Sequence, residues 1–250
     1  MKKYVLLVLL IALGISFVSF SLNPEKKKKK RCDPEILITN VMGMGLELEL
    51  YFAQGQEHNH PLMAVWLETT DGEYIQTLYV AESIAKGFFG YGDKSTGKWQ
   101  PGVVRRPAAL PYWGHQRGIQ APDGLYLPTT TNPLPDAYSG PTPQGDFILQ
   151  TRSDKPITGK FNLLFEINQS WDWNFFWTNN KFPDDPEYKT SSQPSLIYAV
   201  TIDPDSPVSE YWLNPIGHGH YAGADGILYT DLSTFSTALD ITKSIKVVLK

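Results

Sequence analysis

Residues 45–52 read Gly-Leu-Glu-Leu-Glu-Leu-Tyr-Phe, and this stretch decides the fold class. Every second side chain from Leu46 to Phe52 is large and apolar, whereas the side chains between them are Glu47, Glu49 and Tyr51. Successive side chains of a strand point to opposite faces, so this period of two predicts a strand with one buried face.

The next stretch of the chain predicts a β-hairpin. Residues 61–67 are nearly continuously apolar, Asp71-Gly72 is a turn signal, and residues 74–80 form a second apolar run. Four later runs also have strand character, namely 145–151, 161–167, 195–202 and 241–249.

Seven short strands without a long segment of helical period favour an all-β fold. We expect an antiparallel immunoglobulin-like β-sandwich with long irregular loop insertions, formed as a single domain by residues 36–250. A short helix fits residues 81–86. The expected core residues are Leu48, Leu50, Val65, Leu67, Leu163, Phe165, Val200 and Ile202.

Two segments lack any regular period. Residues 81–144 contain nine of the 19 prolines, and their aromatic residues Trp99, Tyr112 and Trp113 favour an ordered loop system over a flexible one. Residues 170–192 contain three tryptophans and two phenylalanines between positions 171 and 177.

The N-terminus has the pattern of an export signal. Lys2 and Lys3 precede 17 uncharged residues, so residues 1–21 are expected to be a signal peptide, cleaved after Ser21, or an N-terminal anchor. The polybasic run Lys26–Arg31 lies in an expected linker over residues 22–35, and such a run resists translocation when it flanks a retained helix. We expect a periplasmic or other extracytoplasmic location, with anchoring to the inner membrane as the alternative.

The charge of the chain excludes one class of partner. Beyond residue 31 the sequence carries 14 positive and 25 negative side chains, a net charge of −11. Proteins that bind nucleic acid concentrate positive charge on the folded domain, so no nucleic-acid partner is expected. Membrane association is expected only through the N-terminus. With Cys32 as its single cysteine, the chain has no intramolecular disulfide.

Residues 136–142, Asp-Ala-Tyr-Ser-Gly-Pro-Thr, contain a candidate modification site. The stretch resembles the acceptor motif of flavin transferases, which esterify the phosphate of FMN to the final threonine. It departs from that motif at Pro141, where the pattern has alanine. The resemblance implies covalent FMN at Thr142, with Asp136, Ser139 and Gly140 as further cofactor-binding residues. The alternative is an ordinary turn before the strand at 145–151.

The resemblance extends to a family. Residues 61–68, Asp71-Gly72 and 78–80 are similar to the opening of the predicted periplasmic family called domain of unknown function 2271. The similarity resumes at 98–99, 109–113, 136–142 and 159–163. It implies an exported β-rich protein of unassigned biochemistry, whose relatives are often found near flavin transferases and membrane flavin reductases. We therefore interpret the chain as accessory to an extracytoplasmic redox system. Flavin transferases and membrane flavin reductases are the implied partners.

The histidines suggest a different chemistry. His58 and His60 form one His-x-His pair, and His218 and His220 form another. Alternate residues of a strand project from one face, so each pair is a candidate site for copper or zinc. The alternative is that these histidines lie in solvated turns.

The remaining alternatives are a glycan-binding module and an enzyme. The aromatic residues between 171 and 177 offer flat faces for sugar rings, or fold back over one end of the sheet. Asp184, Asp185 and Glu187 do not have the spacing of an EF-hand. Because the usual nucleophile, phosphate-loop and zinc-protease motifs are absent from the sequence, a carrier or binding module is favoured over an enzyme with its own turnover.

Overall fold

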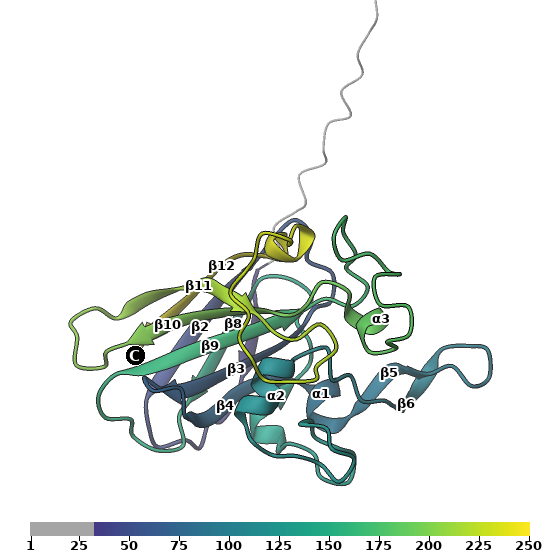
Figure 1. The fold of residues 1–250 in the computed structure, drawn as a ribbon. Coiled ribbons are helices and arrows are strands. Elements are labelled where there is room, and N and C mark those ends of the chain that lie inside the picture. The colour runs from purple at the N-terminus through teal and green to yellow at the C-terminus, as the bar shows by residue number, and fades with distance from the viewer. Residues whose placement is uncertain (1–32) are drawn as a thin grey trace, which may run out of the picture. The chain divides into compact units, whose positions relative to one another are not determined.

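A ten-stranded sheet dominates the computed structural model, which describes residues 33–250 (Figure 1). Across the sheet the strand order is β1-β8-β2-β12-β11-β10-β9-β3-β4-β7. The sheet curls into a nearly closed, barrel-like shape. Its strands are β1 (Glu35–Ile38), β2 (Glu47–Gln54), β3 (Leu62–Thr69), β4 (Tyr74–Ala81), β7 (Ser139–Gly140), β8 (Phe147–Arg152), β9 (Phe161–Asn168), β10 (Leu196–Ile202), β11 (Glu210–His218) and β12 (Thr242–Leu249).

The connections between these strands add short elements. In the connection between β4 and β7, β5 (Phe88–Asp93) pairs with β6 (Gln100–Val103) in an antiparallel hairpin that projects from the sheet (Figure 1). The short helices are α1 (Glu82–Lys86), α2 (Pro111–Gln116), α3 (Tyr188–Ser191) and the 3-10 turns η1 (Asp136–Tyr138) and η2 (Thr237–Asp240).

The mostly-β character expected from the sequence is confirmed. All seven expected strands are present, as is the short helix α1. The expectation of a purely antiparallel sheet is wrong at both edges, where β1 pairs parallel with β8 and β4 pairs parallel with β7. The segments that separate these partners in the sequence are long enough to permit parallel pairing.

Strand β11 joins the two halves of the sheet. Its residues 210–213 pair with β12, whereas residues 214–218 pair with β10. A register shift opposite Ile197 and Tyr198 leaves Ile216 without a partner, next to Pro215. A bulge and a proline both bend a strand, so β11 can pass from one half to the other.

One hydrophobic cluster fills the inside of the curled sheet. Of the eight expected core residues, seven are buried and belong to this cluster, while Val200 packs against it and is partly exposed. The alternation expected for residues 46–52 is also confirmed, because Leu48, Leu50 and Phe52 are buried and Glu47 is exposed.

A second hydrophobic cluster covers the outside of β3, β4, β9 and β10. In β3 the side chains of Met63, Val65 and Leu67 join the inner cluster, whereas Leu62 and Trp66 join the outer one. The outer cluster also contains side chains from the connection after β4, namely Ile84, Ala85, Phe89, Ala109, Leu110, Trp113 and Leu127. Residues 81–134 therefore form an ordered second layer over this half of the sheet.

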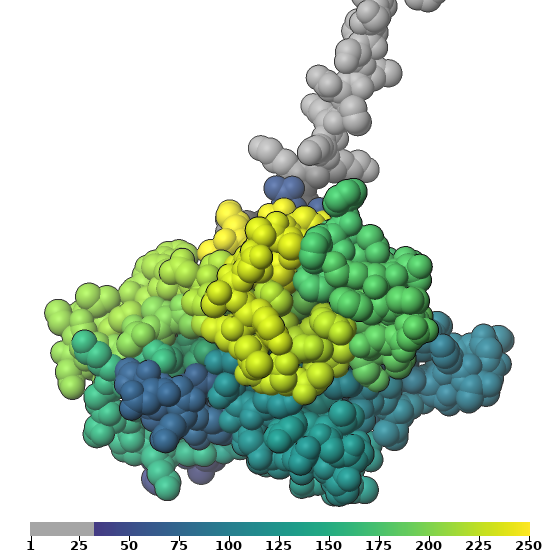
Figure 2. Space-filling view, viewed as in Figure 1, coloured from purple at the N-terminus to yellow at the C-terminus, as the bar shows by residue number. Residues whose placement is uncertain are grey.

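Two further connections pack side by side over one face (Figure 2). Residues 170–192 meet the connection between β11 and β12 through a stacked pair of rings, Phe182 and Tyr221, whose centroids are 4.1 Å apart. The Trp177 indole N–H donates to Thr234 Oγ1 at 3.1 Å.

Residues Asp33–Lys250 form one compact unit. Strand β1 begins at Glu35, the last residue of the expected linker. The expected signal peptide or anchor over residues 1–21, the polybasic run and Cys32 lie outside the described residues. Among residues 33–250, no helix has both the length and the apolar character needed to cross a membrane.

Candidate functional site

The acceptor-like stretch 136–142 is tied to the sheet. It begins as the turn η1 and continues as β7, in which Ser139 pairs with Val80 and Gly140 with Ala81. The Tyr79 hydroxyl donates to the backbone oxygen of Pro141 at 2.7 Å. The stretch is therefore held in place, up to the residue before Thr142.

Gly140 does not adopt the left-handed conformation that would make a loop bendable. Its φ is not positive, because Pro141 follows and favours extended backbone at the residue before it. A Cβ at position 140 would lie 3.2 Å from the Tyr79 ring. The absence of a Cβ at Gly140 therefore allows the Tyr79 ring to lie close to the backbone.

The other residues of the motif differ in exposure. Asp136 is exposed, and its carboxylate lies 3.3 Å from the Lys86 ammonium of α1. Ser139 and Thr142 are half-buried. Within the part of the chain that the structure describes, no protein group hydrogen-bonds to the Thr142 hydroxyl, which leaves its oxygen available for reaction.

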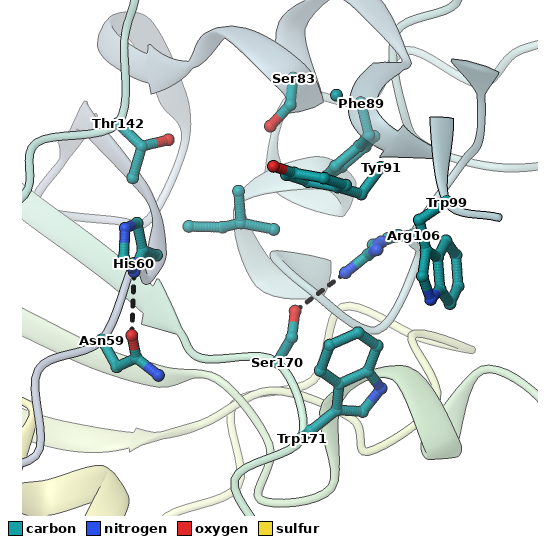
Figure 3. A pocket seen from close by; sticks show the side chains of 12 residues that line it. Asn59, His60, Ser83, Phe89, Tyr91, Trp99, Arg106, Thr142, Ser170 and Trp171 are labelled. Atoms are coloured by element: carbon teal, nitrogen blue, oxygen red, sulfur yellow. Dashed lines mark hydrogen bonds between the residues drawn. The ribbon is translucent and has the colours of Figure 1, made fainter. Parts of the chain in front are cut away.

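Thr142 lines a pocket of about 590 Å³ (Figure 3). Ligand pockets typically measure about 300–1,000 Å³ and combine apolar walls with a few polar groups. Five separate segments of the chain contribute to this pocket. The lining residues are Asn59, His60, Leu62, Ser83, Phe89, Gly90, Tyr91, Trp99, Arg106, Thr142, Ser170 and Trp171.

Strained backbone occurs at two places in the pocket wall. His60 has φ of 54° and Trp171 has φ of 62°, values that bulky L-residues rarely adopt. They are two of the four non-glycine residues with positive φ between residues 33 and 250. Such strain concentrates at binding sites, where surrounding structure enforces it.

Aromatic rings and one cation form the far end of the pocket from Thr142 (Figure 3). The Trp99 and Trp171 ring centroids are 6.5 Å apart, and both side chains are about half exposed. The Arg106 guanidinium lies 4.7 Å from the Phe89 ring centroid and donates to Ser170 Oγ at 2.9 Å. Burial lowers the pKa of Arg106, an effect that nearby Glu187 partly offsets.

A second hollow of about 330 Å³ adjoins the first at Thr142. The two share Ser83, Gly90 and Thr142, and the second also contains Lys86. Hydrogen bonds to Glu82 and Asp136 raise the pKa of Lys86. Thr142 thus has on one side a polar hollow, in which Lys86 is paired with Glu82 and Asp136, and an aromatic pocket on the other.

The four candidate metal-binding histidines lie in two separate places. His60 is exposed, lines the pocket, and hydrogen-bonds to Asn59 at 2.9 Å, while His58 packs against Phe52 with ring centroids 5.7 Å apart. His218 Nδ1 bonds the Gly219 carbonyl at 2.8 Å, and burial lowers its pKa.

His220 is tied into its own loop. Its Nδ1 accepts from the backbone N–H of Ala222 at 3.1 Å and of Ala224 at 3.2 Å. Across residues 33–250, no three His, Cys, Asp or Glu side chains are grouped as a metal site would require.

The aromatic run 171–177 divides into two parts. Trp177 is buried against His218 and Phe235, as expected of a loop folded back on the sheet. Phe175 is fully exposed, and Trp173 and Phe176 are nearly half exposed.

Sequence reasoning missed most of the pocket wall. Arg106 follows another arginine and precedes Pro107 in a segment without a period, so nothing marks it as inward-facing. The alternation of aromatic residues with glycine in Phe88-Phe89-Gly90-Tyr91-Gly92 is a signal that identifies a strand with an aromatic face.

Comparison with protein-family models, with curated proteins and with solved structures finds no match to this chain. The resemblance to the family of domain of unknown function 2271 therefore stays an expectation, based on the residues quoted above.

Proposed function

We propose that this protein is a flavin carrier that is accessory to an extracytoplasmic redox system, with FMN bound covalently at Thr142. The observation that supports this proposal most strongly is the position of Thr142. The resemblance of residues 136–142 to an acceptor motif concerns only the loop, whereas the pocket beside Thr142 has the size and the aromatic lining that suit a flavin ring.

The attachment is a group transfer from FAD. The Thr142 oxygen forms a bond to the phosphorus of the FMN half, the bond from that phosphorus to AMP breaks, and the hydroxyl proton leaves with AMP as the second product. A flavin transferase is the catalyst in this proposal. When bound, the flavin supplies electron transfer, and a membrane flavin reductase is the proposed electron donor.

The chain's own residues bind and shield the group. Lys86 and Ser83 lie beside Thr142, where the negative phosphoester would be held. Phe89, Tyr91 and Trp99 would place aromatic surfaces against the ring. We also propose that the curled sheet is a variant of an immunoglobulin-like sandwich, with β11 shared between its two layers.

The proposal is tested by co-expression of the full chain with a flavin transferase. Attachment adds about 438 daltons, the mass of FMN less water, and a yellow colour that stays with the denatured polypeptide. Thr142→Ala should abolish both, because alanine has no hydroxyl. Thr130→Ala, which changes an exposed threonine that does not line the pocket, should leave both intact.

Pro141→Ala sharpens this test, since it restores the full acceptor pattern. Attachment only after this substitution would show that the natural chain has the family loop without its cofactor. Attachment to neither form would contradict the proposal.

A glycan-binding module is the second candidate. The observation that favours it is the pair of half-exposed indoles, Trp99 and Trp171, in the wall of the same pocket, because exposed tryptophan faces stack on sugar rings. A glycan array screened with the unmodified protein and with Trp99→Ala would distinguish this function from flavin attachment.

A further inference from the structure

We infer that Arg106 binds the carbonyl edge of the ring in this pocket and sets the electron affinity of the bound flavin. The inference rests on the proposed function, and it assigns a role to a residue outside the acceptor motif. Among the residues that line the pocket, Arg106 is the only side chain with a permanent charge.

The position of Arg106 fits this role. Thr142 lies at one end of the pocket and Arg106 at the other, so a group attached at Thr142 extends toward the guanidinium (Figure 3). The aromatic side chains of Phe89 and Tyr91 line the pocket wall on the way to Arg106, and Trp171 lies at the far end (Figure 3). A flat ring therefore meets aromatic surfaces on its faces and a cation at one edge.

Arg106 has N–H groups that can donate hydrogen bonds to a ligand. A guanidinium has five N–H groups, and among the described residues only Nη1 is hydrogen-bonded, to Ser170. The guanidinium also lies over the Phe89 ring, a contact that holds it in place. A planar donor held in this way suits a ligand with acceptors along one edge, as in the pyrimidine part of the flavin ring.

The charge of Arg106 affects how readily the bound flavin is reduced. A flavin bound here would carry one negative charge, around N1 and the C2 oxygen, once it had taken up two electrons and one proton. A cation at that edge stabilises the reduced form more than the neutral oxidised form, because attraction between opposite charges is stronger in a half-buried site than in water. Arg106 should therefore make the flavin easier to reduce.

The experiment measures the reduction of the covalently loaded full chain. Dithionite is the reductant, a dye reports the potential, and flavin absorbance gives the ratio of reduced to oxidised flavin. At a fixed potential, Arg106→Met should lower this ratio about tenfold, since the charge-assisted hydrogen bond is lost. Arg106→Lys should retain most of the wild-type ratio.

Lys160→Met is the matched control. It removes one positive charge from an exposed site that is not part of the pocket wall, so it should leave the ratio unchanged. Should Arg106→Met fail to fold, Arg106→Gln, which keeps a donor for Ser170, takes its place. An unchanged ratio in the loaded Arg106 variant would overturn the inference while leaving the carrier function intact.

A failure of the proposed carrier function would be recognised separately, from the mass of the polypeptide. If the wild-type chain gains no 438 daltons, free riboflavin becomes the probe, and quenching of tryptophan fluorescence reports binding to the unmodified protein. Binding about tenfold weaker in Arg106→Met would sustain the role of Arg106 at the ring edge. Equal binding, or no binding to either form, would overturn it.

Discussion

Strands β2 and β3 belong to the same sheet but are buried in different ways. In β2 the buried side chains alternate with partly or fully exposed ones, whereas in β3 every side chain from Leu62 to Glu68 is buried. The sequence differs in the same way, since residues 46–52 alternate between apolar and other side chains and residues 61–67 are almost all apolar. A continuous apolar run thus marks a strand covered on both faces.

The cover on the outer face of β3 comes from the irregular connection 81–134. This layer forms a second hydrophobic core outside the sheet. It also supplies Ser83, Phe89, Tyr91, Trp99 and Arg106 to the pocket. The part of the chain with the least periodic sequence therefore builds most of the candidate site.

The largest expected effect tests whether the outer layer belongs to the same folding unit as the sheet. Trp113 of α2 is fully buried, and its indole N–H donates to Thr77 Oγ1 at 2.9 Å. Trp113→Ala should lower the free energy of unfolding by about 3–5 kcal/mol, as should Phe165→Ala in the inner core. Urea unfolding followed by circular dichroism and by fluorescence would measure both.

Coincident transitions are expected for the two variants. Trp113→Ala could instead shift the fluorescence transition to lower urea concentration and leave the circular dichroism transition unchanged. The outer layer would then unfold independently, and the burial of both faces of β3 would not reflect a single folding unit.

A smaller effect concerns the polar contact that fastens α2 to β9. Glu166 is fully buried, and its carboxylate accepts the backbone N–H of Tyr112 at 3.2 Å and of Trp113 at 2.7 Å. Ser195 Oγ donates to the same carboxylate at 2.5 Å. Burial raises the pKa of Glu166 to about 7.

The direction of the pH effect follows from this shift. The folded pKa of Glu166 lies above the unfolded value of about 4.5, so its contribution to stability is complete below that value and is lost as pH rises through about 7. Glu166→Gln does not titrate. The difference in unfolding free energy, wild type minus variant, should fall by on the order of 3 kcal/mol between pH 4 and pH 8.

Chemical denaturation at several pH values would measure this difference. A difference independent of pH would mean that Glu166 keeps one protonation state throughout, and that the outer layer is not fastened by a titrating group.

The smallest expected effect lies within the aromatic run 171–177. Trp177 is buried, whereas Phe175 is fully exposed, two residues away. Phe175→Ser should change the unfolding free energy by less than about 0.5 kcal/mol. Trp177→Ala should cost about 3 kcal/mol. Thermal unfolding of the two variants side by side provides the measurement, and similar losses in both would show that Phe175 packs against another part of the protein.

Strands with a strong local pattern could be predicted from the sequence, whereas β11 could not. Residues 210–218 contain Pro215 and the polar residues Glu210 and Asn214, and they show no alternation of apolar and polar side chains. Most of the strand is also exposed. The strand forms because β10 and β12 offer free edges on either side of it. Its existence depends on pairing with β10 and β12 and not on a side-chain pattern of its own.

Some residues of the candidate site could be recognised in the sequence, whereas others are brought to it only by folding. The acceptor-like stretch was recognisable because its residues are consecutive, and Thr142 could be singled out for its hydroxyl. Arg106, Ser170 and His60 are brought to the same pocket only by folding, since they come from three different connections. The left-handed backbone of His60 and Trp171 likewise has no local signal, because neither residue is a glycine.

The sequence alone determined the mostly-β class, seven strands and the buried face of most of them, and it also marked Thr142 as the residue of the proposed attachment. These features follow from the alternation of side chains along an extended backbone and from the chemistry of single residues. Tertiary structure alone decided the curled sheet, the outer layer over β3 and the pocket beside Thr142. Each of these depends on contacts between segments far apart in the chain, which local side-chain patterns do not encode.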